Sequence, residues 1–172
     1  MGRLSLLAAL AAVFLLVPGA AFAAVLEGKP GADEIRGTDG ADMLLGGPGK
    51  DHLDGRGGVD LHRGGLGDDT LIDHAGDDVL RGGSGDDAFG GNPGDDAVFG
   101  GDGNDLLLDD AGEDLFSGGD GNDVIAVPGF GPGPPGLPSE SDSISCGTGN
   151  DRVVAHRVDL VFADCEEVER IR

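Results

Sequence analysis

A nine-residue unit repeats eleven times between Gly28 and Ala126, with no insertion or deletion between copies. Its clearest copy reads Gly-Gly-Asp-Gly-Asn-Asp-Val-Ile-Ala, at 118–126. Every copy has Gly at its fourth place and Asp at its sixth place. A strict short period predicts a fold of stacked coils, in which each unit packs against its neighbours. One carboxylate in every unit predicts rows of cation-binding groups along the stack.

Each unit divides into six turn residues and three strand residues, and the strand has a large apolar residue at its centre. Successive side chains of a strand point to opposite faces, so the central residue faces one side and its neighbours the other. Two units then form one coil, and stacked coils form two parallel sheets that face each other. The predicted core residues are Ile35, Leu44, Leu53, Leu71, Leu80, Phe89, Val98, Leu107, Phe116 and Ile125.

The chain is strongly acidic and poor in large apolar side chains. Its 172 residues have a formal net charge of -22, with 35 Gly and no Trp or Tyr. Such a composition is typical of disordered chains, but a disordered chain has no need of a strict period. The negative charge argues against nucleic acid or an anionic membrane as a partner. It favours cations, because rows of carboxylates on adjacent coils repel each other.

The N-terminus has the pattern of a cleaved secretory signal. Arg3 precedes an apolar run from Leu4 to Val17, and Ala21-Phe22-Ala23 offers small residues at the two positions that a signal peptidase reads. We expect a signal peptide at 1–23, cleavage after Ala23, a secreted or extracellular protein, and no membrane span afterwards. The alternative is a membrane anchor, for which the apolar run is short.

Residues 127–141 are rich in Pro and Gly and predict a loop, because Pro cannot donate a hydrogen bond to a sheet. The register then resumes in a decayed unit, and Cys146 to Val154 form a further unit with Asp151 at its sixth place. We expect 142–172 to cap the open end of the roll. In an oxidising compartment, Cys146 and Cys165 predict one disulfide bond; two free thiols or a metal pair are the alternatives.

The repeat resembles the RTX (hemolysin-type) calcium-binding nonapeptide repeat, Gly-Gly-x-Gly-x-Asp-x-(large apolar)-x, and the ending resembles small exported bacterial proteins with such repeats. The resemblance implies an all-β, right-handed parallel β-roll over 24–126, with several Ca²⁺ ions between the turns of adjacent coils. The implied carboxylate ligands are Asp33, Asp51, Asp69, Asp87, Asp105, Asp123, Asp42, Asp60, Asp78, Asp96, Asp114 and Asp151. The implied carbonyl ligands belong to Gly46, Gly49, Gly64, Gly67, Gly82, Gly85, Gly100, Gly103, Gly118 and Gly121.

Alternate turns lie on opposite edges of such a roll, and the two edges differ in sequence. Five of the six turns that begin at Gly28, Gly46, Gly64, Gly82, Gly100 and Gly118 have the full motif. The turns that begin at Gly37, Gly55, Asp73, Gly91 and Asp109 all lack Gly at the second place, where Thr38, Arg56, His74, Asn92 and Asp110 stand. Either the first edge binds calcium more strongly, or the repeat tolerates these replacements without loss of binding.

Two further features stand outside the repeat pattern. His62 replaces the central apolar residue of its strand. It is either a polar residue near the surface of a coil or a pH-sensitive weak point of the core. Nothing near it in the sequence suggests a zinc ligand set. An apolar column recurs once in every coil on the outer face of one sheet, either for β-propensity or to be covered by another segment or molecule. Its members are Met43, Leu61, Val79, Ala97 and Leu115.

The expected function is that of a secreted calcium-binding protein, folded by its ions, with a structural, cell-surface or adhesive role. The alternative is a self-assembling or partner-binding adhesion module, which would use the apolar column to form a homo-oligomer or to bind a cell surface. Catalysis is not expected, because His-Glu-x-x-His and Gly-x-Ser-x-Gly are both absent from the sequence. A toxin-type export substrate fits poorly, because that group usually lacks a cleaved N-terminal signal.

Overall fold

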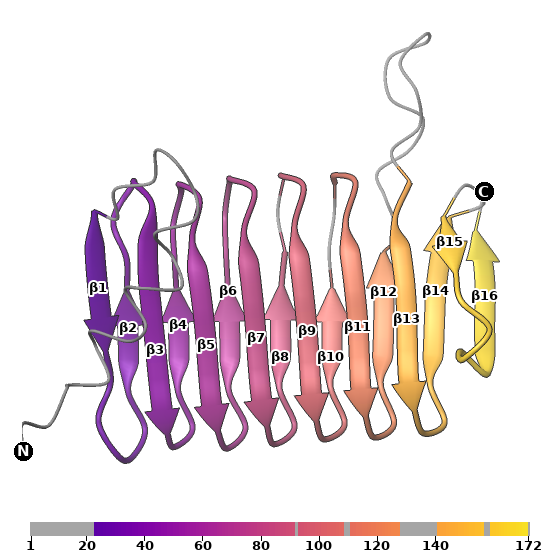
Figure 1. Cartoon of the computed structure of the whole chain (residues 1–172), viewed down its shortest axis with the longest axis horizontal. Helices are drawn as coiled ribbons and strands as arrows, with labels where there is room; N and C mark the ends of the chain where they lie inside the picture. Colours follow the sequence, from indigo (N-terminus) through magenta and orange to yellow (C-terminus); the bar gives the residue numbers. More distant parts are fainter. Residues whose placement is uncertain (1–22, 92, 109–110, 128–140, 157–158, 172) are drawn as a thin grey trace, which may run out of the picture.

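The computed structural model describes residues 23–91, 93–108, 111–127, 141–156 and 159–171. Within these ranges the chain is all-β, and its strands form two eight-stranded parallel sheets that face each other along an elongated roll (Figure 1). Residues 1–22 of the predicted signal segment (1–23) and residues 128–140 of the predicted loop (127–141) lie outside the described residues. No helix in the described part of the chain is long and apolar enough to cross a membrane.

The chain alternates between the two sheets, one strand at a time. The first sheet contains, in spatial order, β1 (Ala24–Glu27), β3 (Asp42–Pro48), β5 (Leu61–Leu66), β7 (Val79–Ser84), β9 (Ala97–Asp102), β11 (Leu115–Asp120), β13 (Ser143–Thr148) and β15 (Leu160–Val161). The second sheet contains β2 (Glu34–Arg36), β4 (His52–Asp54), β6 (Thr70–Ile72), β8 (Ala88–Gly90), β10 (Leu106–Leu108), β12 (Val124–Val127), β14 (Arg152–His156) and β16 (Glu167–Ile171).

The register confirms that two repeat units form one coil, which has 18 residues. In the first sheet Leu44 pairs with His62, and His62 pairs with Leu80, each time one coil further on. In the second sheet Leu53 pairs with Leu71 in the same way. The side chains at the centres of these strands are buried between the sheets, and all of them except His62 belong to one apolar core. This core is thin, because each repeat unit contributes a single large side chain.

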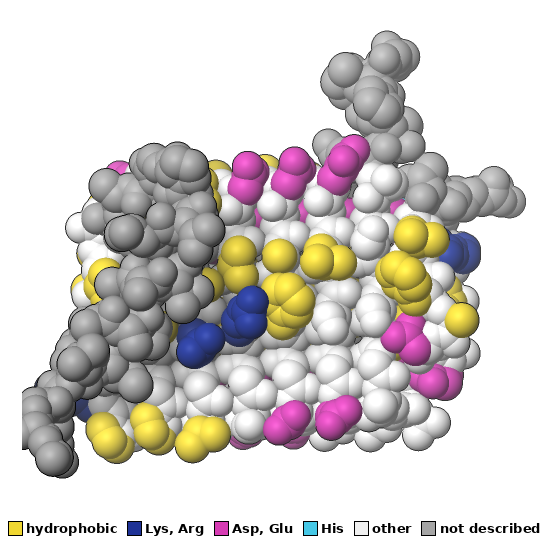
Figure 2. Space-filling model, in the orientation of Figure 1, with side chains coloured by type: hydrophobic (Ala, Val, Ile, Leu, Met, Phe, Trp, Pro, Cys, Tyr) yellow, Lys and Arg dark blue, Asp and Glu magenta, His cyan; other side chains and the backbone are white. Residues whose placement is uncertain are grey.

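The outward apolar column is aligned as predicted. Met43 pairs with Leu61, and the line continues strand by strand through Val79 and Ala97 to Leu115. Its members differ in exposure: Met43 is buried, whereas Leu115 is 44% exposed. Figure 2 shows apolar side chains along this outer face and acidic side chains along both edges of the roll.

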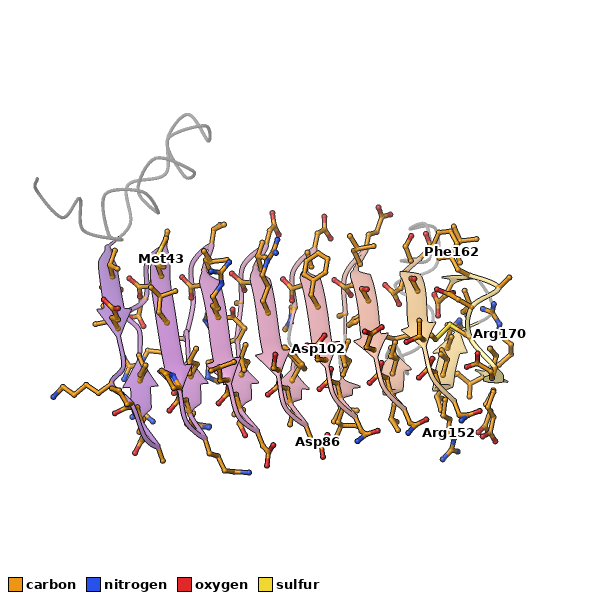
Figure 3. The ribbon with its side chains drawn as sticks, turned by 60° about the horizontal axis from the view of Figure 1, so that its bottom comes forward. Met43, Asp86, Asp102, Arg152, Phe162 and Arg170 are labelled. Carbon is orange, nitrogen blue, oxygen red and sulfur yellow. A yellow bond between two sulfur atoms is a disulfide. The ribbon has the colours of Figure 1, made fainter. Side chains whose placement is uncertain are left out.

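The C-terminal segment adds two more coils, and the disulfide prediction is confirmed. Cys146 and Cys165 are bonded, with an S–S distance of 2.04 Å. β13 pairs with β11 at a separation of 28 residues rather than 18, so the segment between β12 and β13 adds ten residues without changing the register. In the final coil, Arg170 donates hydrogen bonds to the carbonyl oxygens of His156 and Asp159, at 2.8 and 2.9 Å (Figure 3).

Candidate metal centres

The turns gather on two edges of the roll. The first edge holds the turns that follow the strands of the first sheet, at the bottom of Figure 1, and the second edge holds the turns that follow the strands of the second sheet. The second-place glycines of the first edge have a positive φ; Gly83, for example, has a φ of 122°. A Cβ on Gly83 would lie 2.2 Å from the carbonyl oxygen of Gly65 in the preceding coil. Glycine is therefore required there by both conformation and space.

The sixth-place aspartates form a hydrogen-bonded ladder along the first edge. One carboxylate oxygen, Oδ1, of each aspartate accepts a hydrogen bond from the backbone N–H of the equivalent aspartate in the preceding coil. The bond from Asp69 to Asp87 measures 2.7 Å, and the bond from Asp87 to Asp105 measures 2.8 Å. The same bond links Asp33, Asp51, Asp69, Asp87, Asp105, Asp123 and Asp151, at 2.7–2.9 Å. The ladder therefore orients every carboxylate in the same way.

The second carboxylate oxygen, Oδ2, has no hydrogen-bond partner in the ladder beyond Asp33, whose Oδ2 accepts a hydrogen bond from Lys29 N. This oxygen is buried and unpaired in Asp51, Asp69, Asp87, Asp105, Asp123 and Asp151. Buried polar atoms in proteins nearly always have a partner, so a regular row of unpaired carboxylate oxygens needs an explanation. A cation between the coils would supply the missing partner to each oxygen in the row.

Backbone carbonyl groups converge on the same positions. A Cβ on Gly82 would lie 2.1 Å from Asp87 Oδ2 and 2.7 Å from the carbonyl oxygen of Gly100 in the next coil. The same arrangement is found at Gly46, Gly64, Gly100 and Gly118. At Gly118 the carbonyl oxygen of the next coil belongs to Cys146 instead of a glycine. The first-place carbonyl groups thus lie beside the Asp oxygens. The fourth-place carbonyl groups of Gly49, Gly67, Gly85, Gly103 and Gly121 instead face the fourth-place glycine of the next coil.

Burial raises the pKa of four carboxyl groups in this row. It raises the pKa of Asp87 from 3.8 to about 7 and that of Asp105 to about 6, and the charges of neighbouring aspartates add to the effect. The pKa values of Asp69 and Asp123 are raised for the same main reason. The hydrogen bond from the preceding coil opposes the shift but does not cancel it. A bound divalent cation would remove this penalty, because it offsets the charges of the carboxylates that flank it.

The second edge has the same aspartate ladder but different turns. Asp42, Asp60, Asp78, Asp96 and Asp114 are linked by Oδ1 bonds of 2.6–2.8 Å. At the second place Arg56 adopts a positive φ of 75°, whereas Thr38 and His74 do not. The side chain of Thr38 turns inward instead and donates a hydrogen bond to Asp42 Oδ2, at 2.9 Å. The second-place positions Asn92 and Asp110 lie outside the described residues.

His62 is fully buried, so its interpretation as a polar residue near the surface is wrong. Nothing near His62 in the sequence suggests a zinc ligand set, but the fold brings such a group together. Asp60, His62 and Asp73 each offer one ligand atom, and these three atoms lie within 4.8 Å of one another. The sequence does not reveal this group directly, because Asp73 lies beyond His62 on the next turn of the second edge.

The sequence reasoning also missed two sets of polar residues that complete the ladders. At the fifth place of the first-edge turns, Asn104, Asn122 and Asn150 each donate a backbone hydrogen bond to the side chain one coil earlier, at 2.8–3.0 Å. In the last coil the side chain of Glu166 accepts the hydrogen bond from Asp151 N, a bond that a sixth-place aspartate accepts in the other coils. The recurrence of Asn at the fifth place could have revealed the first set; the irregular spacing of the cap hides Glu166.

The fold and these sites define a class of protein: a parallel β-solenoid with rows of candidate cation sites between its coils. The family model of the RTX calcium-binding nonapeptide repeat (four copies) matches residues 27–61, 63–98 and 90–125. The chain belongs to this family, whose repeats bind calcium and are typical of secreted proteins. No curated protein matches the chain significantly. A calcium-binding structural protein fits both the family and the fold.

Proposed function

We propose that this chain is an exported, non-catalytic structural protein whose roll is folded and stabilised by several Ca²⁺ ions held between the coils of the first edge. The observation that carries the proposal is the row of buried, unpaired Oδ2 atoms, five of which lie beside a carbonyl oxygen of the next coil. Calcium prefers oxygen ligands of this kind, carboxylate and backbone carbonyl together. Magnesium demands a smaller and more regular octahedron and keeps its water, so it fits these positions poorly.

Calcium has a clear physical task in this fold. Each unit orders its residues around a single large apolar side chain, and ordering a chain has a large entropic cost. An ion that binds only the folded chain shifts the equilibrium toward the roll. Calcium is scarce in the cytosol and plentiful outside the cell, so the roll would fold after export. In support, the first strand begins at Ala24, where cleavage after Ala23 would place the mature N-terminus.

The direct test is far-UV circular dichroism of the mature chain, 24–172, during a calcium titration, with magnesium as the control. We expect a change from coil to β-structure with calcium and little change with magnesium. A chain that is fully folded in chelator would contradict the proposal, because the core and the disulfide would then suffice.

We further propose that the first edge binds calcium more strongly than the second. Five first-place glycines on the first edge lie between a buried, unpaired Asp oxygen and a carbonyl oxygen, at Gly46, Gly64, Gly82, Gly100 and Gly118. On the second edge, Thr38 occupies an oxygen of Asp42, and Asp73 replaces a first-place glycine. Native mass spectrometry in calcium should therefore show about five tightly bound ions. Equal occupancy of both edges would refute this asymmetry.

An adhesive or self-assembling role is a second candidate. The exposed side chains of Leu115, at 44%, and Leu160, at 56%, lie in the same register of the first sheet, with Ser143 between them. Exposed apolar side chains in one line favour contact with another surface. Light scattering with and without calcium would distinguish an assembling protein from a monomeric one.

A further inference from the structure

Two departures from the repeat meet in space on the second edge. His62 replaces the apolar residue at the eighth place of one unit, and Asp73 replaces the glycine at the first place of a later unit. His62 Nε2 and Asp73 Oδ2 lie 3.5 Å apart. Each replacement alone would put a polar side chain into the interior at a cost. Together they put an imidazole nitrogen and a carboxylate oxygen on the same small volume.

Asp60 supplies a third group to this volume. A Cβ on Gly55 would lie 2.4 Å from His62 Nε2 and 2.7 Å from Asp60 Oδ2. At Gly37, one coil earlier, the same position lies beside Asp42 Oδ2 and the carbonyl oxygen of Gly55. At Gly55, therefore, an imidazole nitrogen stands where the other turns present a carbonyl oxygen. This exchange changes the preference of the site, because an imidazole nitrogen is a poor calcium ligand and a good transition-metal ligand.

The imidazole ring of His62 points to a missing ligand. The side chain is fully buried, and neither ring nitrogen has a hydrogen-bond partner. Asp60 Oδ2, beside it, is also buried and unpaired. In the first sheet the ring lies between Leu44 and Leu80, so the core offers it no polar partner from its own column.

The composition of the group suits a divalent cation. Asp60 and Asp73 offer two carboxyl groups beside the ring of His62, and Asp73 also interacts with Asp78 on the same turn. An unprotonated imidazole nitrogen is a common metal ligand, and a bound cation would offset the charge of the carboxylates.

We propose that Asp60, His62 and Asp73 form a binding site for a divalent transition-metal ion, with Zn²⁺ as its ligand, separate from the calcium row of the first edge. Zinc binds His nitrogen and Asp oxygen at about 2.0–2.2 Å in tetrahedral geometry, so two of its ligands lie about 3.4 Å apart. The observed separation of 3.5 Å between His62 Nε2 and Asp73 Oδ2 matches this value. The three ligand atoms form the one such group in the described part of the chain.

The site would join two neighbouring coils. Asp60 belongs to the turn that begins at Gly55, and Asp73 begins the following turn on the same edge. The ion would therefore link these coils at the point where the first-place glycine is missing. The proposal does not depend on calcium folding the chain, because it concerns different side chains on the opposite edge.

The test is the zinc content of the mature chain with its calcium sites saturated, measured by equilibrium dialysis and elemental analysis. The main variant is His62→Leu, which restores the apolar residue found in the adjacent strands. The control is His74→Gln, because His74 is an exposed histidine whose Nε2 lies 3.4 Å from Asp54 Oδ1 and could bind zinc on the surface. Circular dichroism of the same samples reports folding, so that a failure of calcium-driven folding is distinguished from a failure to bind zinc.

We expect one Zn²⁺ in the wild-type chain and in His74→Gln, and binding weaker by more than about ten-fold in His62→Leu. Co²⁺ in place of zinc should give the visible absorption of a tetrahedral site in the wild-type chain and no such absorption in His62→Leu. Asp73→Gly, which restores the first-place glycine, provides a second variant if His62→Leu does not fold. Equal zinc content in wild type and His62→Leu, loss of zinc in His74→Gln, or no retained zinc in the wild type would overturn the proposal.

Discussion

The substitution Asp87→Asn should change stability in opposite directions with and without calcium. The amide oxygen of Asn can still accept the hydrogen bond from Asp69 N, which measures 2.7 Å in the wild type. The bond from the residue 87 backbone to Asp105 is also preserved. The substitution therefore removes only the negative charge and the unpaired Oδ2 atom. Its effect isolates what that oxygen does when the ion is present and when it is absent.

Without calcium, Asp87→Asn should stabilise the roll at pH 7. Burial raises the pKa of Asp87 from 3.8 to about 7, so the folded chain disfavours the charged form that the unfolded chain prefers. Each ten-fold difference in proton affinity corresponds to about 1.4 kcal/mol, which sets an upper limit of about 4 kcal/mol. Water and salt at the edge of the roll reduce this value, so we expect a gain of about 2 kcal/mol.

With calcium, the same substitution should destabilise the roll, because the ion beside Gly82 loses a charged ligand. An ion present at a hundred times its dissociation constant contributes about 2.7 kcal/mol, so losing one site outweighs the gain of about 2 kcal/mol from removing the charge and leaves a net loss of about 0.7 kcal/mol. Urea unfolding followed by circular dichroism measures both effects, with a constant concentration of trimethylamine N-oxide to populate the calcium-free roll.

Asp86→Asn is the matched control, since Asp86 is the exposed neighbour whose Oδ1 accepts hydrogen bonds from Asn104 (Figure 3). It should have little effect in either condition. A change of the same sign for Asp87→Asn in chelator and in calcium would refute the assignment of Oδ2 as a calcium ligand.

Three further predictions concern the backbone, the pH and the cap. Gly83→Ala should destabilise the calcium-bound roll by about 3 kcal/mol in urea unfolding, because its methyl group would collide with a carbonyl oxygen of the preceding coil. The control Gly90→Ala should be neutral, because a Cβ there has no atom within 4 Å. In chelator, with trimethylamine N-oxide again present to populate the calcium-free roll, thermal unfolding should show the roll becoming more stable from pH 8 to pH 5. Carboxyl groups with folded pKa values of about 6 or 7 bind protons more tightly when folded, and this stabilisation is lost as the pH rises through those values. In calcium the trend should reverse, because protons compete with the ion; the same trend in both would refute the argument. Reduction of Cys146–Cys165 should lower the free energy of unfolding by about 3 kcal/mol while the calcium-induced β signal of the remaining coils persists, and complete loss of that signal would contradict a local role for the cap.

The strict period explains why so much of the fold could be predicted. A constant spacing of 18 residues determines which residues stack, so the register, the core column and the aspartate ladder follow from the sequence alone. The disulfide was predictable because only two cysteines are present. The final coil was not, because Glu166 follows Asp151 by 15 residues, and no period indicates that its side chain accepts the bond from Asp151 N.

The group around His62 illustrates a second limit. The sequence places Asp73 on the turn next to Asp60, but not the direction of its side chain. That direction depends on the backbone of the turn, where a carboxylate at a place usually occupied by glycine must find room. The backbone at His74, with no positive φ and with its N–H donating to Asp73 Oδ1 at 2.9 Å, determines that direction. The repeat pattern does not specify local backbone conformation of this kind, which only the three-dimensional structure shows.

The ten residues added between β12 and β13 have a practical meaning for protein engineering. They enter the roll on its second edge, and the strands on either side still pair in register. The described first-edge turns from Gly46 to Asp123 have no such addition, because each must place a carbonyl group and a carboxylate at a constant spacing. A foreign peptide is therefore best grafted into a second-edge turn, where the coil accepts extra length and displays it at a regular distance from its neighbours.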